Sequence, residues 1–357
     1  MPSSTSNSNS RCPTAPYAKV WFYVVLLVGL FLTASEFHWR NAGFLPNIVD
    51  TKIFWSEHRH QVYTDQEHKK MVIVGSSRAQ LGIDPVLLNE HFPEYQVVHL
   101  ALDGALSTEV IKDLCNDPNF DGIILADLTV PFLCATDAAA TQKERDYIHY
   151  YHDKFQTNSE LEKRLNAQLG ASFQSRFVIL SPTLSFASLL YTRLNPKQLY
   201  VHMQKNRFRP AYYYDRLSEA ERIKHRKKRI DGITKNPIAQ ISTERFTLAT
   251  QEVLGDHYKK LRKRGGKIVL VRLPTTGEHW QVDQKMAPKT EFWDQLKTLT
   301  GIPTVHFKDY KELANFDCPD TSHLDAKDVP TFTNNLGQIV RSSLDDYDLK
   351  ANHEQNL

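Results

Sequence analysis

The fold prediction for this chain depends most on residues 71–78, which have the sequence MVIVGSSR. Four apolar residues in a row, without alternating polar positions, are typical of a short strand that is buried on both faces of a parallel sheet. The strand ends at Gly75, where two serines and an arginine begin a turn into a helix. Ligands of doubly wound α/β sheets bind at the carboxyl ends of the strands, so this turn is the first place to expect a functional site.

The rest of the chain repeats this alternation of short apolar runs and helical patterns. Strands are expected at 95–100, 122–128, 267–273 and 303–307, and helices at 84–91, 107–114, 244–264, 291–299 and 325–342. Buried strands alternating with helices are typical of a parallel sheet covered on both faces. We therefore predict an α/β fold, a doubly wound parallel sheet in one domain over residues 71–343, with a tail at 344–357.

The alternation stops over residues 141–240, which we interpret as a helical insertion. This segment has 19 Lys+Arg and 9 Asp+Glu, a net charge of +10, and its densest basic run is RIKHRKKR at 222–229. Two interpretations stay open. The run is either a solvated helix face, or a lid or platform for an anionic polymer or for phospholipid headgroups.

The composition excludes several classes of protein. The 357 residues are 41% hydrophobic and 24% charged with a net charge of +3, which excludes global disorder. The four cysteines include no CxxC pair or Cys/His cluster, so neither a disulfide scaffold nor a metal site is predicted, and no cofactor is expected. Whether Cys115 and Cys134 pair stays open. No nucleic-acid-binding motif is present, so nucleic acid is not an expected partner.

The N-terminus carries the one stretch that predicts a membrane segment. After a polar leader (1–19), residues 20–35 are free of charge, and with the flanking residues to 39 they approach the roughly 20 residues of a membrane span. Trp21 and Trp39 are suited to the interface. We expect an uncleaved signal anchor at 20–39 followed by a polar connector at 40–70, with a cleaved signal peptide or a buried core helix as alternatives.

The charges around this segment predict its orientation. Arg11 and Lys19 precede it, which favours a cytoplasmic N-terminus. The expected location is therefore a single-pass membrane protein whose main domain is periplasmic or extracellular.

Two short motifs carry the predicted chemistry. The Gly-Ser-Ser turn presents Ser77 at the rim of the sheet and exposes backbone N–H groups at a helix start, which suits a nucleophilic serine, although such a turn is often only a helix cap. Near the C-terminus, DTSHL at 320–324 offers His323 as a general base and Asp320 as the carboxylate that orients it, or else only a helix cap. In the predicted topology both loops meet at one edge of the sheet.

With these motifs the chain resembles the SGNH (GDSL-type) hydrolase superfamily, a three-layer α/β/α flavodoxin-like fold, and in particular its membrane-anchored cell-envelope branch. The resemblance implies that Ser77 is the nucleophile, His323 the base and Asp320 its orienting partner. HLALDG at 99–104 matches the second block of the family, so that the Gly104 N–H would bind the oxyanion together with that of Ser77. The third block, Gly-x-Asn-Asp, is not matched, because LADL stands at 125–128.

The resemblance implies a serine acyl-transfer enzyme of the cell envelope, an esterase or an O-acetyltransferase that modifies an anionic or neutral glycan. A multi-spanning membrane protein that supplies the acyl group is a candidate partner. Two alternatives stay open: a non-catalytic glycan-binding or assembly protein on the same fold, and a lipid-directed esterase.

Other residues are weaker candidates for substrate contact. Arg78 is placed to clamp an anionic group but is also typical of a salt-bridged arginine. Asp127 and His279 follow the third and fourth expected strands on the same rim, where each is either a site residue or part of an ordinary loop. The aromatic triplet at 212–214 either stacks on sugar rings or belongs to the core.

Overall fold

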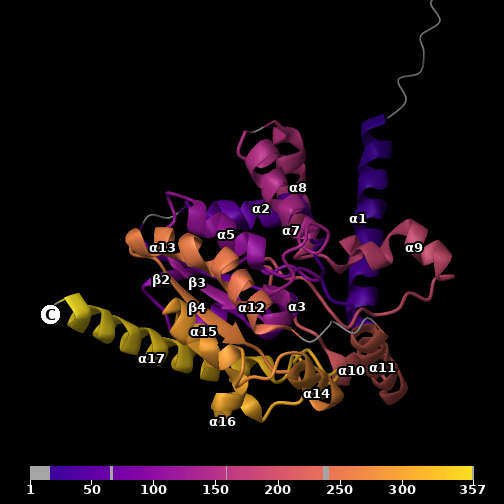
Figure 1. The fold of residues 1–357 in the computed structure, drawn as a ribbon. Helices are drawn as coiled ribbons and strands as arrows, with labels where there is room; N and C mark the ends of the chain where they lie inside the picture. Colours follow the sequence, from indigo (N-terminus) through magenta and orange to yellow (C-terminus); the bar gives the residue numbers. More distant parts are fainter. Residues whose placement is uncertain (1–16, 65–66, 158, 236–240, 356–357) are drawn as a thin grey trace, which may run out of the picture.

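The computed structural model describes residues 17–64, 67–157, 159–235 and 241–355. Most of the expected leader, including Arg11, and the last two residues of the expected tail lie outside the described residues. One sheet forms the centre of the molecule, with helices around it (Figure 1).

The sheet consists of five parallel strands in the order β2-β1-β3-β4-β5. Their bounds are β1 Lys69–Val74, β2 Tyr95–His99, β3 Ile123–Asp127, β4 Lys267–Arg272 and β5 Thr304–His306. All five strands lie where the apolar runs predicted them, which confirms the α/β fold and the parallel sheet. The order reverses between β1 and β3, so the carboxyl ends of these strands form the crevice in which doubly wound sheets bind their ligands.

Successive residues of each strand pack into opposite layers of the core. On β1, Val72 and Val74 face one layer of helices, whereas Met71 and Ile73 face the other. The first layer contains α5 (Thr108–Asn116), α12 (Thr243–Thr250), α13 (Asp256–Lys263) and α15 (Trp293–Thr300). The second contains α3 (Ser77–Gly82), α4 (Pro85–Glu90), α16 (Lys311–Ala314) and α17 (Val329–Gln355). Short helical segments complete the connections: α6 Val130–Leu133, η4 Gln251–Gly255, α14 Gly277–Met286 and η5 Phe307–Asp309.

The structure differs from the expectation at two boundaries. Within the expected connector, α2 (Lys52–Gln61) buries Trp55 and Arg59 against the first core layer. The sequence of this segment is mostly polar, yet Arg59 is buried. Its charge is balanced by Asp113 at 3.0 Å and by Asp117 at 2.8 Å. Within the expected tail, α17 continues to Gln355 and still buries Leu344.

The described residues of the basic insertion are largely helical, as expected, and contribute no strand to the sheet. It contains α7 Gln142–Tyr150, η1 Tyr151–Phe155, α8 Leu161–Gln174, η2 Val178–Leu180, η3 Pro182–Leu184, α9 Phe186–Tyr191, α10 Tyr213–Arg216 and α11 Glu219–Lys235. The run at 222–229 lies on α11, beside α14.

The N-terminal helix α1 (Tyr17–Asn41) projects from the body of the protein (Figure 1). It is long and apolar enough to cross a membrane, and its apolar window buries none of its residues inside the protein. These properties are compatible with a single-pass anchor. Cys115 and Cys134, whose pairing the sequence left open, are free buried thiols in this structure.

Candidate active site

The turn after β1 holds Ser77 at the carboxyl edge of the sheet. Ser76 caps α3, because its Oγ accepts from the Arg78 N–H, and Ser77 is the first residue of the helix. Gly75 is required here, since a Cβ at this position would lie 2.6 Å from the Ala79 Cβ and 2.9 Å from the Asp127 Cβ. The close approach of β1, α3 and β3 therefore fixes the direction in which Ser77 leaves the sheet.

The second loop precedes α17 and carries Asp320 and His323. Its backbone is strained at Thr321, a β-branched residue with φ +74°, a conformation that costs about 1–3 kcal/mol. Hydrogen bonds hold this conformation: the Thr321 N–H donates to Cys318 O at 2.7 Å, and Thr321 O accepts from the Thr276 N–H at 3.0 Å. The strained residue thus lies between Asp320 and His323, at the point where the loop turns these two side chains toward the sheet.

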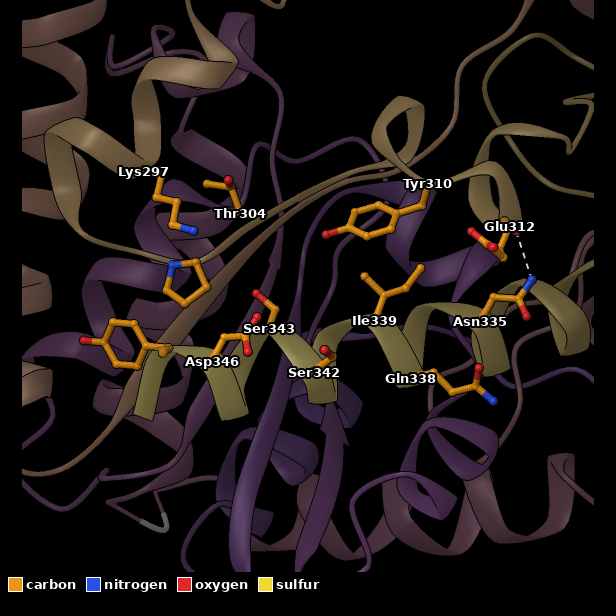
Figure 2. A pocket seen from close by; sticks show the side chains of 12 residues that line it. Lys297, Thr304, Tyr310, Glu312, Asn335, Gln338, Ile339, Ser342, Ser343 and Asp346 are labelled. Atoms are coloured by element: carbon orange, nitrogen blue, oxygen red, sulfur yellow. Dashed lines mark hydrogen bonds between the residues drawn. The ribbon is translucent and has the colours of Figure 1, made fainter. Parts of the chain in front are cut away.

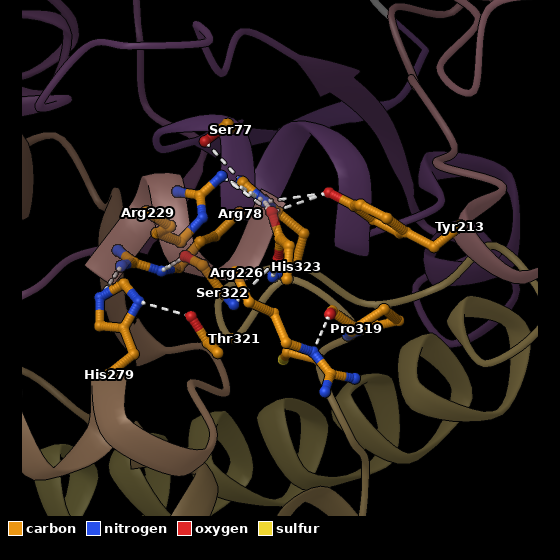
Figure 3. Close-up of polar contacts among 12 residues, drawn as sticks. Ser77, Arg78, Tyr213, Arg226, Arg229, His279, Pro319, Thr321, Ser322 and His323 are labelled. Carbon is orange, nitrogen blue, oxygen red and sulfur yellow. Dashed lines mark hydrogen bonds and ion pairs between the residues drawn. The ribbon is translucent and has the colours of Figure 1, made fainter. Parts of the chain in front are cut away.

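The two loops meet in a serine–histidine–aspartate arrangement (Figure 3). His323 Nε2 lies 2.8 Å from Ser77 Oγ, and His323 Nδ1 lies 2.8 Å from Asp320 Oδ2. The carboxylate is an acceptor, so Nδ1 carries the proton and Nε2 is free to accept the proton of the Ser77 hydroxyl. The three residues that the sequence suggested as a triad are therefore joined by hydrogen bonds in the order Asp320, His323, Ser77.

Asp320 is buried and accepts five hydrogen bonds. Its Oδ1 accepts from the backbone N–H groups of Ser322 and His323, and its Oδ2 accepts from His323 Nδ1, Tyr213 and Arg229. Burial by itself would raise the pKa of Asp320, but the charges and hydrogen bonds of His323 and Arg229 and the backbone donors outweigh it and lower the pKa. The carboxylate therefore stays ionised and keeps the imidazole of His323 in one orientation.

Two of these donors come from the insertion and were not predicted. The Tyr213 hydroxyl lies 2.9 Å and Arg229 Nη2 lies 2.8 Å from Asp320 Oδ2, and Arg229 Nη2 is also 3.2 Å from His323 Nδ1. Arg226, one turn earlier on α11, donates to Pro319 O at 2.6 Å. The aromatic triplet and the basic run were visible in the sequence, but no spacing relates either of them to residue 320.

Arg78 points into the protein behind the nucleophile. Its Nε donates to Ser322 Oγ at 3.0 Å, and its Nη2 lies 3.3 Å from His279 Nε2 (Figure 3). Burial and the charge of Arg78 lower the pKa of His279 to about 3, so the ring is neutral and its Nε2 accepts from the guanidinium. Its Nδ1 then donates to Thr321 Oγ1, at 3.4 Å. This network connects the turn that carries Ser77 to the loop that carries His323.

The three weaker candidates for substrate contact are all buried. Asp127, at the end of β3, lies 3.4 Å from Ser76 Oγ, and burial raises its pKa although Arg78 and Arg272 act in the opposite direction. Arg78 and His279 are enclosed in the network described above. Direct contact of these residues with substrate, which the sequence suggested, does not fit this geometry, and they support the loops instead.

Gly104 lies in an exposed turn after β2 and has φ +67°, a conformation that favours glycine. The same turn is joined to the nucleophile turn by the hydrogen bond from the Leu102 N–H to Gly75 O at 3.0 Å. The second-block loop and the nucleophile turn are therefore neighbours, as the oxyanion assignment requires. At the end of β3, Thr129 caps α6, and no asparagine stands there.

A cavity of about 510 Å³ opens beside the loop of the base, between α11 and the start of α14. Its lining includes Arg226, Lys227, Thr276, Glu278, Asp317 and Thr321. Thr276 and Glu278 of this lining belong to the loop after β4 and the start of α14. A second cavity, of about 480 Å³, lies between α15, β5 and α17 (Figure 2). Neither cavity has Ser77, Asp320 or His323 in its lining.

Comparisons of the chain with family models, curated proteins and solved structures gave no match. The functional conclusion therefore rests on the residues and their geometry.

Proposed function

We propose that the protein is a membrane-anchored serine acyl-transfer enzyme, an esterase or an O-acetyltransferase that acts on a glycan of the cell envelope. The observation that carries the proposal is the pair of 2.8 Å contacts that join Ser77 to His323 and His323 to Asp320. A buried, ionised aspartate behind a histidine that contacts a serine hydroxyl is the arrangement that activates a serine nucleophile.

In the first half-reaction, His323 Nε2 takes the proton of Ser77 as Oγ attacks the carbonyl carbon of an acyl ester. The oxyanion is bound by the backbone N–H of Ser77, at the start of α3, and by that of Gly104. His323 then gives its proton to the departing alcohol, which leaves the acyl group on Ser77.

In the second half-reaction, His323 removes a proton from the acceptor, whose oxygen attacks the acyl carbonyl. His323 then returns this proton to Ser77 Oγ as the bond between the acyl group and Ser77 breaks. Water as acceptor gives an esterase, and a sugar hydroxyl gives an O-acyltransferase.

The order of the sheet supports membership of the SGNH superfamily. The nucleophile follows β1 at the switch point, and the aspartate and histidine precede the last helix. The departure from the family pattern at the end of β3 leaves Ser77 and Gly104 as the proposed oxyanion donors.

The anchor and the envelope location belong to the same proposal. α1 is the candidate membrane span, and the basic residues before it favour an external position for the domain. A reporter enzyme fused after Leu357 should be active outside the cytoplasm. A cytoplasmic signal from this fusion would contradict the location and the glycan substrate.

Hydrolysis of an activated acetyl ester tests the chemistry. Ser77→Ala and His323→Ala should abolish turnover with the fold retained, because both side chains lie on loops at the sheet edge. Asp320→Asn should retain partial activity, since the base remains but is no longer held in one orientation. Unchanged turnover in Ser77→Ala would contradict the proposal and favour a binding protein.

A further inference from the structure

Between residues 177 and 194 the insertion exposes several large apolar side chains. Phe177, Leu180, Phe186, Leu190, Tyr191 and Leu194 form the set, which we call the apolar surface 177–194. Phe186 is 77% exposed and Tyr191 is 90% exposed. Single exposed apolar residues are common on soluble proteins, but so many within 18 residues of chain are typical of an interaction surface.

Helix α8, which precedes this surface in the chain, also exposes apolar side chains. Leu161, Leu165, Leu169 and Phe173 recur every fourth residue and are all exposed, so they form one stripe along the helix. α8 leads directly into Phe177 and contacts η2. In Figure 1, α8 and α9 lie on opposite sides of α1, with α9 beside its C-terminal half.

Specific contacts fix this surface at the end of α1. The two carboxylate oxygens of Glu36 accept from the backbone N–H groups of Val178 at 3.0 Å and Ile179 at 3.1 Å, and Arg40 donates to Arg176 O. Trp39 of α1 packs with Leu189 of α9 around Val178 and Leu184. Figure 1 accordingly shows α9 beside the C-terminal half of α1.

The position of Glu36 along α1 sets the height of the apolar surface. Glu36 is the first charged residue after the apolar run 20–35, so it marks the level at which the chain would leave the hydrocarbon core. The backbone of η2 is hydrogen-bonded to Glu36, and α9 follows within six residues. The side chains of α9 are therefore held where a bilayer crossed by α1 would meet water.

The charges around this surface fit the same environment. Residues 161–197 contain five basic side chains and one acidic side chain. Apolar and aromatic side chains with basic residues among them are typical of segments that lie in the membrane interface and attract anionic headgroups.

We propose that the apolar surface 177–194 lies in the headgroup and acyl-chain boundary of the bilayer that α1 crosses. The inference requires that α1 spans a membrane, but it does not require that Ser77 is catalytic. The domain then has two attachments to the lipid, a span and an interfacial surface, which restrict its rotation about α1.

Tryptophan quenching by brominated lipid tests the proposal on the full-length protein. The probe is a vesicle of phosphatidylcholine and phosphatidylglycerol, prepared with and without bromine on the acyl chains. Leu190→Trp introduces the reporter on α9, where Leu190 is 59% exposed. Leu349→Trp is the matched control, because Leu349 is 68% exposed and lies near the C-terminal end of α17, far from α1 in Figure 1. The wild-type chain, which has five tryptophans, provides the background to subtract.

We expect the emission added by Leu190→Trp to shift to shorter wavelength in vesicles and to be largely lost in brominated lipid. The emission added by Leu349→Trp should be unaffected. If Leu190→Trp does not fold, Phe186→Trp gives the same readout.

If the wild-type chain floats with the vesicles, equal and small quenching of the signals added by the two variants would overturn the proposal and indicate that the surface binds a protein instead. A wild-type chain that does not float with the vesicles would overturn the membrane span itself. Neither result depends on ester hydrolysis, so failure of the proposed chemistry remains distinguishable.

Discussion

Replacing Arg229 with glutamine should move the pH dependence of the proposed reaction. Arg229 Nη2 lies 2.8 Å from Asp320 Oδ2 and 3.2 Å from His323 Nδ1, so its charge faces the base that takes up the proton of Ser77. A guanidinium in this position opposes a positive charge on the imidazole. Arg229→Gln removes this repulsion, and the acid limb of kcat/KM should therefore move to higher pH.

The size of this displacement follows from the distance and the exposure. Two unit charges about 4 Å apart interact by about 1 kcal/mol in water and by about 4 kcal/mol at an effective dielectric constant of about 20. The side chain of Arg229 is 32% exposed, so solvent screens the interaction and the lower part of this range applies. At about 1.4 kcal/mol per pH unit, we expect a displacement of about one unit.

The assay is kcat/KM for an activated acetyl ester, measured from pH 5 to pH 9. Lys228→Gln is the matched control, because it removes the same charge from the neighbouring, exposed position on α11. It should leave the profile unchanged, and Arg229→Lys should return the acid limb toward that of the wild type. An acid limb of Arg229→Gln that coincides with the wild-type limb would refute the electrostatic role of Arg229.

Three further predictions concern the surroundings of the site. Tyr213→Phe removes one neutral donor to Asp320 Oδ2 while the other four remain, so urea unfolding should show a loss of about 1 kcal/mol, and a loss near zero would contradict the contact. Burial and the charge of Arg207 lower the pKa of His99 to about 3, so between pH 6.5 and 3 the unfolded chain binds a proton that the folded chain does not, and stability falls as the pH falls. From pH 7 to pH 5 the free energy of unfolding should fall by about 2 kcal/mol in wild type but not in His99→Gln. An equal loss in the two proteins, measured by urea unfolding at both pH values, would count against a neutral His99. Replacing the exposed Lys227 and Lys228 with glutamine should raise KM for an anionic polymeric substrate and weaken its salt dependence, with turnover of a small neutral ester unchanged, whereas equal losses on both substrates would indicate a structural role.

The sheet and the proximity of Ser77 and His323 were accessible from the sequence, because apolar runs mark the strands and the topology of a parallel sheet brings the two loops to one edge. MVIV at 71–74 has the apolar run of a buried strand, and a parallel sheet brings the carboxyl ends of its strands to one edge. Once Ser77 follows the first strand and His323 precedes the last helix, the topology by itself brings them close. The 2.8 Å contact between them agrees with that expectation.

The surroundings of the triad were not accessible, because they depend on tertiary contacts of buried polar groups. Arg78 appeared available to substrate, but its guanidinium is satisfied inside the protein by Ser322 and His279. Arg229 appeared to belong to a solvated or polymer-binding face, but α11 brings it to Asp320, 91 residues away along the chain. The side chain of a charged residue in an insertion has no periodic pattern that relates it to a distant loop.

α2 was missed for the same physical reason. Its sequence, KIFWSEHRHQ, is mostly polar, and a sequence pattern treats a charged residue as exposed. Arg59 is instead fully buried and paired with two aspartates, Asp113 within α5 and Asp117 at its C-terminal end. The pairing, which makes its burial possible, is a property of the folded chain.

Covalent labelling of Ser77 tests the proposed triad most directly. A fluorophosphonate reacts with a serine hydroxyl that a neighbouring base activates, and intact-mass analysis followed by peptide mapping identifies the modified residue. We predict one adduct per chain on Ser77, strong slowing in His323→Ala, and no adduct in Ser77→Ala. A wild-type protein that stays folded and unlabelled, or an adduct that persists in Ser77→Ala, would contradict the assignment of Ser77 as the nucleophile.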